Sequence, residues 1–450
     1  MKIHPLTWTL PLTAATVVSL TGCPGPDVLP RNVIVMVADG CGFNHVDAAN
    51  LWAYGRPGCQ RYERFPVRVA VDTHPADAPP YHPALFWERL DEALAHPTDS
   101  AAAATALGCG VKTVNGRLGQ TPDGAPVPSF LELAHGRGLG TGVVTSVLFS
   151  HATPAGLLVH HPDRDRYAEI SRAILRDGFA DVVMGAGHPH FDQEGRPDPT
   201  PDYRFVGGED TWNLLTRDDA PLGWTLADTR EAVRALMQGP TPPRVLGVAP
   251  VRETLQQQRA GDPHADPFAE PPLESVPTLT EMSLAALNVL DDRPEGFALM
   301  IEGGAVDWAS HENQTGRMVE EMMEFNATVD AVMDWIEAHG GWDETLLIIT
   351  ADHETGYLHA PGRRSHAPLA GRGPGALPDV AWSTLEHSNS LVPLYARGPG
   401  ARTLQYAARL SDPVRGWYLD NTLVGRLLCL WATGQAEDDA EEAPRLAAGR

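Results

Sequence analysis

The segment Asn32-Val33-Ile34-Val35-Met36-Val37-Ala38 is an uninterrupted apolar run, rich in β-branched side chains and bounded by polar residues. Such a run is typical of a strand that is buried on both faces, as the strands of parallel sheets are. The run stops at Asp39-Gly40. The segment therefore predicts a central parallel strand that carries an acidic residue at its carboxyl end.

The same pattern recurs along the chain. Further apolar runs predict strands at residues 142–148, 180–184, 297–301, 345–350 and 391–396. Helical patterns lie between them, at residues 129–136, 166–176, 278–290 and 317–339. Alternating strands and helices indicate an α/β fold, which we predict to be a three-layer sandwich with a large, mostly parallel central sheet and helices on both faces. Ligands of such folds bind beyond the carboxyl ends of the strands.

Three regions rich in proline or glycine interrupt this pattern, near residues 56–97, 188–277 and 361–385. We interpret them as loop insertions on a single domain that spans residues 31–433. Residues 434–450 are acidic and rich in alanine, which predicts a flexible tail.

The N-terminus has the features of a targeting segment. Residues 6–20 are mostly apolar, but they are too few and too polar to span a membrane well. They end at Leu20-Thr21-Gly22-Cys23, which resembles the lipobox of bacterial lipoproteins. The resemblance implies a signal peptide at residues 1–22, lipid on Cys23, a tether at residues 23–30, and export to the periplasm or outer membrane. An ordinary signal peptide that happens to contain a cysteine is the alternative.

Charge and cysteine content restrict the partners and leave one question open. The net charge of −24 disfavours nucleic acid or an anionic membrane surface as a partner, and it means that a phosphate site would need local cations. Four cysteines besides Cys23 could form disulfides in an exported chain or remain thiols, and their spacing does not decide between these: Cys41, Cys59, Cys109 and Cys429.

A second informative stretch is Asp99-Ser100 followed by four alanines. Alanine is the strongest helix former, and Asp and Ser are favoured at helix starts, so a helix should begin here. The N–H groups and partial positive charge of a helix N-terminus suit a phosphate, and a serine there is suited to be a nucleophile. A capped helix without a chemical role is the alternative.

Acidic residues and histidines follow several predicted strands: Asp39, His151, Glu302, Asp352 and His353. Asp307 and His311 are four residues apart, so one face of a helix can present both to one divalent metal. His387 precedes another strand. Asp, Glu and His without cysteine suit Zn²⁺ in a hydrolytic site, and an oxygen-rich subset suits Mg²⁺. A surface ion pair, for Asp307 and His311, and a structural histidine, for His387, are the alternatives.

Taken in order, these motifs resemble the alkaline phosphatase family over roughly residues 31–430. The motifs are Asp39-Gly40, Asp99-Ser100-Ala101, His151-Ala152-Thr153-Pro154, Glu302-Gly303-Gly304 with Asp307 and His311, Asp352-His353-Glu354, and His387. The resemblance implies an alkaline phosphatase-like fold and hydrolysis of small phosphate monoesters through a phosphoserine intermediate. It also implies two zinc ions, one magnesium ion and a homodimer.

The resemblance also implies roles for individual residues. Ser100 would be the nucleophile, and Arg164 would clamp two phosphate oxygens. The ligands of one zinc would be Asp39, Asp352, His353 and Ser100. Those of the second zinc would be Asp307, His311 and His387, and those of magnesium would be Asp39, Thr153 and Glu302.

The chain departs from several bacterial members of the family at two positions. Position 151 is His instead of Asp, and position 308 is Trp instead of Lys. A neutral His151 removes an anionic partner from the magnesium site, so we expect weaker magnesium binding and competition from zinc, and the ion that occupies this site stays open. Trp308 offers phosphate no charge; a packing role at the site wall is the alternative to a binding role.

Two other functions deserve comparison with a phosphate monoesterase. A phosphodiesterase, or another hydrolase of the same superfamily, would generally lack the Asp-Ser-Ala segment followed by His-Ala-Thr-Pro. A lipid-anchored metal- or phosphate-binding protein would be expected to have lost Ser100 or Arg164, and both are present.

Overall fold

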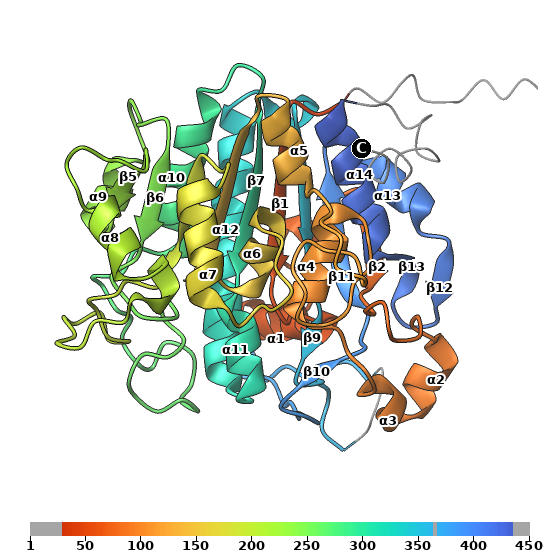
Figure 1. Ribbon diagram of the computed structural model, residues 1–450. Helices are drawn as coiled ribbons and strands as arrows, with labels where there is room; N and C mark the ends of the chain where they lie inside the picture. Colours follow the sequence, from red (N-terminus) through yellow and green to blue (C-terminus); the bar gives the residue numbers. More distant parts are fainter. Residues whose placement is uncertain (1–28, 363–366, 435–450) are drawn as a thin grey trace, which may run out of the picture.

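Strand β1 spans Asn32–Ala38, as its sequence predicts, and lies inside an 11-stranded sheet. The computed structural model describes residues 29–362 and 367–434. Seven neighbouring strands of the sheet are parallel to one another (Figure 1). In sheet order they are β8 (Thr345–Thr350), β1, β7 (Phe297–Gly303), β3 (Gly140–Leu148), β4 (Val182–Ala186), β6 (Val245–Val248) and β5 (Thr225–Ala227).

Four further strands extend the sheet beyond β8. Strand β11 (Val392–Arg397) is antiparallel to β8 and to β2 (Val67–Asp72). Strand β13 (Gly416–Asp420) is parallel to β2, and β12 (Leu410–Asp412) closes this edge. The prediction of a large, mostly parallel central sheet is confirmed.

Two of the three regions that we interpreted as loop insertions contribute strands to this sheet. β2 comes from residues 56–97, and β5 and β6 come from residues 188–277. The pattern that specifies β2 is short. Every second residue of the strand is a buried valine, namely Val67, Val69 and Val71, as expected for a strand with one face in the core. Strands as short as β5 and β6 leave too little periodicity to be recognised.

Helices cover the two faces of the sheet, as predicted (Figure 1). One layer contains α4 (Ser100–Cys109), α5 (Phe130–Gly136), α6 (Ala152–Leu158) and α14 (Asn421–Thr433), which pack against one another. The other contains α1 (Phe43–Tyr54), α9 (Arg230–Ala235), α10 (Leu279–Asp291), α11 (Ala305–His311) and α12 (Thr315–Ala338). Shorter helices are α2 (Pro83–Glu88), α3 (Leu90–Ala93), α7 (Tyr167–Arg172), α8 (Glu209–Leu215) and α13 (Ala401–Ala407).

The predicted helix at 166–176 is split in the structure. It forms α7 and then a π-helical turn at Ala173–Asp177. Single 3₁₀ turns lie at Arg61–Arg64, Tyr203–Val206 and Gly341–Asp343. A two-stranded ribbon of β9 (Glu354–Thr355) and β10 (His387–Ser388) stands apart from the main sheet.

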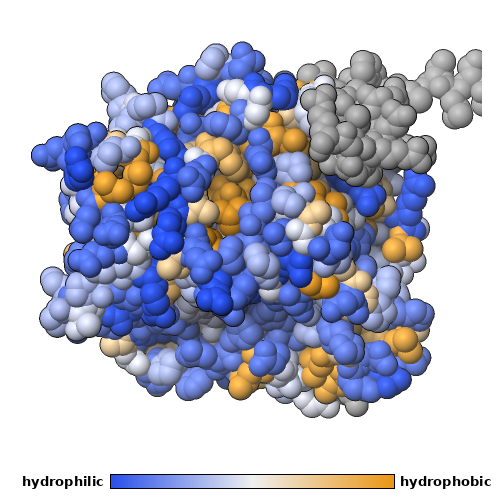
Figure 2. Space-filling view, in the orientation of Figure 1, coloured by the Kyte–Doolittle hydropathy of each residue, from blue (hydrophilic) through white to orange (hydrophobic). Residues whose placement is uncertain are grey.

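Hydrophilic residues cover most of the surface seen in Figure 2, with apolar residues in small groups between them. Within residues 29–362 and 367–434, none of the helices has both the length and the hydrophobicity needed to cross a bilayer. The predicted signal peptide at residues 1–22, Cys23 and residues 435–450 of the predicted tail lie outside the described residues.

Candidate active site

Four adjacent parallel strands direct their carboxyl ends to one place. In the order β8, β1, β7 and β3, they lead into Asp352, Asp39, Glu302 and the turn before His151. The carboxylates of Asp39, Glu302 and Asp352 belong to residues that are fully buried. The sheet thus concentrates three acids in the interior at the rim where α/β folds bind their ligands.

Ser100, the first residue of α4, belongs to the same group. The helix starts there because the Asp99 carboxylate accepts a hydrogen bond from the backbone N–H of Ala102 at 2.9 Å. Ser100 is buried, and its Oγ lies 3.2 Å from Nε2 of His353. The serine that the sequence predicts at a helix N-terminus therefore lies among the acidic and histidine side chains.

The first cluster consists of Asp39, Asp352 and His353. Nε2 of His353 lies 3.5 Å from a carboxylate oxygen of Asp39 and 3.1 Å from one of Asp352. The other oxygen of Asp352 accepts hydrogen bonds from the backbone N–H groups of Gly40 and His353, which fixes the carboxylate. The free atoms of all three residues converge next to Ser100.

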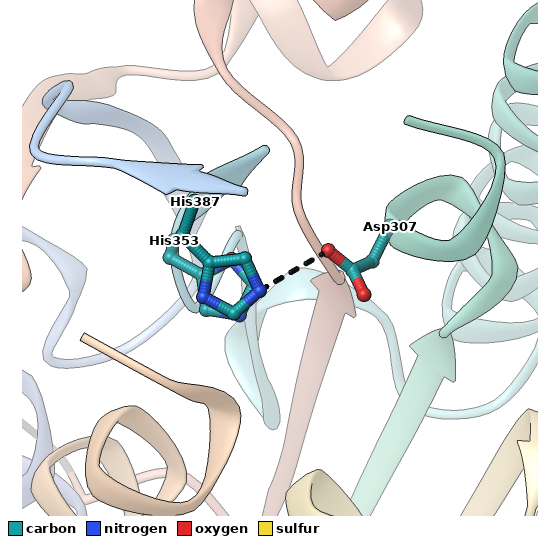
Figure 3. Close-up of side chains that lie close together, drawn as sticks. All are labelled: Asp307, His353 and His387. Carbon is teal, nitrogen blue, oxygen red and sulfur yellow. Dashed lines mark ion pairs between the residues drawn. The ribbon is translucent and has the colours of Figure 1, made fainter. Parts of the chain in front are cut away.

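The second cluster is built on α11, which places Asp307 and His311 one turn apart, as the spacing predicts. The Asp307 carboxylate lies 3.3 Å from Nε2 of His311 and 3.6 Å from Nε2 of His387. Figure 3 shows it directed at the imidazoles of His353 and His387, whose rings stack with centroids 3.5 Å apart. Nδ1 of His387 lies 2.7 Å from the carbonyl oxygen of Thr98, so Nε2 is left to face the cluster.

The third cluster joins Asp39 to Glu302 and His151, whose potential ligand atoms lie within 4.8 Å of one another. Thr153, in the first turn of α6, is buried. The half-buried Trp308 makes an edge-on contact with the His151 ring, with centroids 5.6 Å apart. Trp308 therefore packs beside this cluster, against His151. These are the two positions at which the chain departs from several bacterial members of the family.

The buried carboxylates of the three clusters would be stabilised by a bound cation. Several buried polar atoms have no hydrogen-bond partner among the described residues, namely both carboxylate oxygens of Asp39, Oδ2 of Asp352, Oε1 of Glu302 and Nδ1 of His151. Burial, and repulsion by neighbouring carboxylates, raise the pKa values of Asp39 and Asp352 well above the usual range. Burying unpaired carboxylates is costly, and a bound metal ion would remove this cost.

The pKa values of the histidines are shifted in opposite directions in the first and second clusters. Burial and the neighbouring His387 hold the pKa of His353 well below its usual value, so this imidazole is neutral and has a lone pair to donate. Burial would also lower the pKa of His311, but the Asp307 carboxylate outweighs it and raises that pKa to about 9. A metal ion would have to displace the proton of His311.

Arg164 contacts Asp99, the residue that precedes Ser100, and is held by two partners. One guanidinium nitrogen donates to the Asp99 carboxylate at 3.0 Å, and the other lies 3.2 Å from Nε2 of His151. Asp99 therefore caps the helix of Ser100 with one oxygen and orients Arg164 with the other. A planar guanidinium in this position can bind two oxygens of a phosphate group.

Glu354 belongs to the motif Asp352-His353-Glu354, but the sequence alone indicates no role for it. Its buried carboxylate accepts hydrogen bonds from the Ser388 hydroxyl and from the Leu358 backbone N–H. Because Ser388 pairs with Glu354 in the β9–β10 ribbon, this contact fixes the segments that carry His353 and His387. Its position directly after the Asp352-His353 pair was the one available signal.

A buried serine lies among carboxylates and imidazoles, and several of their polar atoms have no hydrogen-bond partner within the described residues. This is the arrangement of a metal-binding enzyme. The mostly parallel sheet that carries it places the chain among the α/β enzymes. The family model for alkaline phosphatase matches residues 30–368, and the chain belongs to the alkaline phosphatase family.

Individual relatives agree with this assignment. The chain is 30% identical to streptomycin-6-phosphate phosphatase of Streptomyces griseus, over 92% of this chain and 93% of that protein. It is 29% identical to alkaline phosphatase 4 of Bacillus subtilis (strain 168), over 72% of this chain but only 62% of that protein.

The fold agrees with that of a solved alkaline phosphatase from the Antarctic bacterium TAB5. The two match with a TM-score of 0.63 and 22% identity, over 90% of this chain and 98% of that chain. Variants of the TAB5 protein in which a histidine is replaced by glutamate or aspartate were solved with magnesium bound in its M3 site.

Proposed function

We propose that this chain hydrolyses phosphate monoesters through a phosphoserine intermediate on Ser100, and releases an alcohol and inorganic phosphate. The observation that carries the proposal is the position of the Ser100 hydroxyl, which is buried at a helix N-terminus, 3.2 Å from Nε2 of His353. The preceding residue, Asp99, is paired with Arg164. Membership of the alkaline phosphatase family supports the same reaction.

The residues present fit two zinc ions and one magnesium ion, and we propose these as the cofactors. The buried carboxylate and imidazole atoms without hydrogen-bond partners, in the described chain, are the donors that these ions prefer. We assign one zinc to Asp39, Asp352, His353 and Ser100, and the second to Asp307, His311 and His387. Asp39, Thr153 and Glu302 would hold magnesium, with His151 next to them.

The chain's own groups account for binding and orientation of the ester. Arg164 would pair with two phosphate oxygens, and Asp99 keeps its guanidinium in place. The N-terminus of α4 directs its partial positive charge toward the same phosphate. Bound zinc ions would supply Lewis acidity, which lowers the pKa of the serine hydroxyl and stabilises charge on the leaving oxygen.

The reaction then has two displacements at phosphorus. Oγ of Ser100 gives up its proton and forms the new P–O bond as the bond to the alcohol oxygen breaks, and the leaving alkoxide takes up a proton. Water then gives up a proton and attacks the phosphorus of the phosphoserine, the P–Oγ bond breaks, and Oγ of Ser100 regains a proton. Arg164 can stay paired with the phosphate oxygens through both displacements, because the phosphate does not leave the site between them.

Substitution of the nucleophile tests this proposal. We expect Ser100→Ala to abolish trapping of a phosphoserine and to lower turnover of p-nitrophenyl phosphate by several orders of magnitude, while metals still bind through the remaining ligands. Zinc and magnesium are measured by elemental analysis on both proteins. Near-full turnover by a metal-loaded Ser100→Ala variant would rule out the covalent mechanism.

Several phosphate esters are candidate substrates. One relative, matched over 93% of its length, is named for streptomycin 6-phosphate, and this favours testing that substrate beside simple monoesters. Faster hydrolysis of bis-p-nitrophenyl phosphate than of the monoester would instead support a phosphodiesterase, and metal binding without any turnover would support a binding protein.

We also propose export, with lipid attachment at Cys23, and assembly as a homodimer. The lipobox-like sequence Leu20-Thr21-Gly22-Cys23 supports the first. Mass spectrometry of protein from a bacterial envelope tests it, and an unmodified Cys23 or a mature start elsewhere would contradict it. The homodimer rests on likeness to the family alone, and light scattering of the purified protein decides it.

A further inference from the structure

Helices α4 and α14 cross at very short range on one face of the sheet (Figure 1). A Cβ atom added at Gly425 would lie only 2.3 Å from the carbonyl oxygen of Ala106, so the two backbones are in direct contact there. The Arg426 side chain donates to the carbonyl of Gly110 at 3.3 Å, next to the same crossing. The relative position of the two helices is therefore closely fixed.

Two cysteines lie at this crossing. Cys429 is one turn beyond Gly425 on α14, and its thiol donates to the carbonyl oxygen of Gly108 over 3.5 Å. Gly108 is bonded to Cys109, the last residue of α4. Standard backbone dimensions then place the Cα of Cys109 within about 6 Å of the Cys429 sulfur. This distance is an upper limit, and rotation of the two side chains can bring the sulfurs into bonding range.

The surroundings of the two thiols are consistent with this proximity. Both are free thiols in the structure; Cys109 is buried and Cys429 is half-buried. Burial, together with the neighbouring Cys429 thiol, raises the pKa of Cys109, and burial raises that of Cys429 to about 12. Each thiol therefore resists ionisation, and oxidation should be slow at neutral pH.

We propose that Cys109 and Cys429 are a disulfide-forming pair, which ties the C-terminal end of the helix that carries Ser100 to the last helix of the described chain. The proposal does not depend on the proposed function. Export would bring the pair into oxidising surroundings, where such links form and persist.

The oxidant is a small disulfide or a disulfide-carrying oxidoreductase. The half-buried Cys429 loses its proton and attacks one sulfur of the oxidant, which gives a mixed disulfide and one released thiol. Cys109 then loses its proton and attacks the Cys429 sulfur, and the second thiol of the oxidant leaves. Two protein thiols have been oxidised to one disulfide, and the oxidant disulfide has been reduced to two thiols.

The other two described cysteines serve as internal controls. The Cys41 thiol donates to the carbonyl of Gly42 over 3.5 Å, and the Cys59 thiol lies 3.7 Å from the carbonyl of Pro57. Both contacts are within the cysteine's own loop, and Cys59 is partly exposed. Cys59 therefore reports whether the oxidant has had time to act.

The experiment treats the full-length, metal-loaded protein with oxidised glutathione at mildly alkaline pH until Cys59 is fully modified. Free thiols are then alkylated in denaturant, and peptides are mapped by mass spectrometry without reduction. We expect the Cys109 and Cys429 peptides to be joined in most molecules, and the link to be absent from Cys429→Ser and Cys109→Ala but retained in Cys59→Ser. A stable glutathione adduct on Cys429, a link from Cys429 to another cysteine such as Cys23, or an unmodified Cys429 would each overturn the proposal.

Discussion

Replacement of His151 by aspartate gives the most direct test of the third metal cluster. Burial, together with the nearby positive charge of Arg164, lowers the pKa of His151 to about 3, so the side chain is neutral near pH 7. Its Nδ1 atom is buried and has no hydrogen-bond partner among the described residues. Ligand atoms of Asp39 and Glu302 lie within 4.8 Å of it, so a carboxylate at this position would face the same ion.

The size of the effect follows from this geometry. A carboxylate about 4 Å from a divalent cation gains about 8 kcal/mol at an effective dielectric constant of 20. Part of this gain is lost, because in the metal-free variant the carboxyls of Asp39, Glu302 and the new aspartate lie close together and retain a proton. Magnesium must displace that proton when it binds. Changing a group that supports a metal site typically alters metal affinity 10–100-fold. We therefore expect His151→Asp to lower the magnesium Kd by about 10–100-fold, or about 1.4–2.8 kcal/mol.

The assay titrates magnesium into chelator-stripped protein that has been reloaded with zinc, with the Kd read from calorimetry and the midpoint of activation read in parallel. His151→Asn is the matched control, because it has nearly the same size as aspartate and no charge. Equal magnesium affinities for His151→Asp, His151→Asn and the unmodified protein would refute the reasoning. Tighter magnesium binding by His151→Asn as well would show that the shape of the side chain, and not its charge, limits magnesium affinity.

Three further predictions address residues around the clusters. Trp308→Lys should tighten inhibition by inorganic phosphate about tenfold, since a cation about 4 Å from phosphate gains ~1–4 kcal/mol; an unchanged inhibition constant, with Trp308→Met as control, would mean that this side chain does not face phosphate. Glu354→Ala should weaken zinc binding about 10–100-fold in a chelator competition, because the Ser388 contact that fixes the β9–β10 ribbon is lost, whereas Glu354→Gln should retain most of the affinity. Burial and the nearby Glu320 charge raise the pKa of Glu321 from 4.5 to about 8, so the stability that it contributes is complete below its unfolded pKa and is lost as pH rises through its folded value. Glu321→Gln should therefore reduce the fall in Tm between pH 5 and 8.5, as measured by calorimetry, and an identical pH profile would count against this ionisation.

Much of the fold could be predicted because local patterns encode burial. The run at Asn32–Ala38 forms β1 with the predicted bounds, and so does the run at Thr345–Thr350 that forms β8. Four alanines after an Asp-Ser pair specify α4, since capping and helix propensity depend only on neighbours along the chain. The spacing of Asp307 and His311 placed both on one face of α11 for the same reason.

The tertiary structure alone decided which of these residues meet. Asp39 lies between Asp352 and Glu302 because β1 lies between β8 and β7 in the sheet, and strand order is not encoded in any single strand. Asp99 meets Arg164 across 65 residues of chain, and Glu354 fixes His387 through a two-residue ribbon that is too short to leave a periodicity in the sequence. Local sequence sets whether a side chain is helical, extended or buried, whereas the distances among carboxylates, imidazoles and the serine depend on long-range packing of the whole sheet.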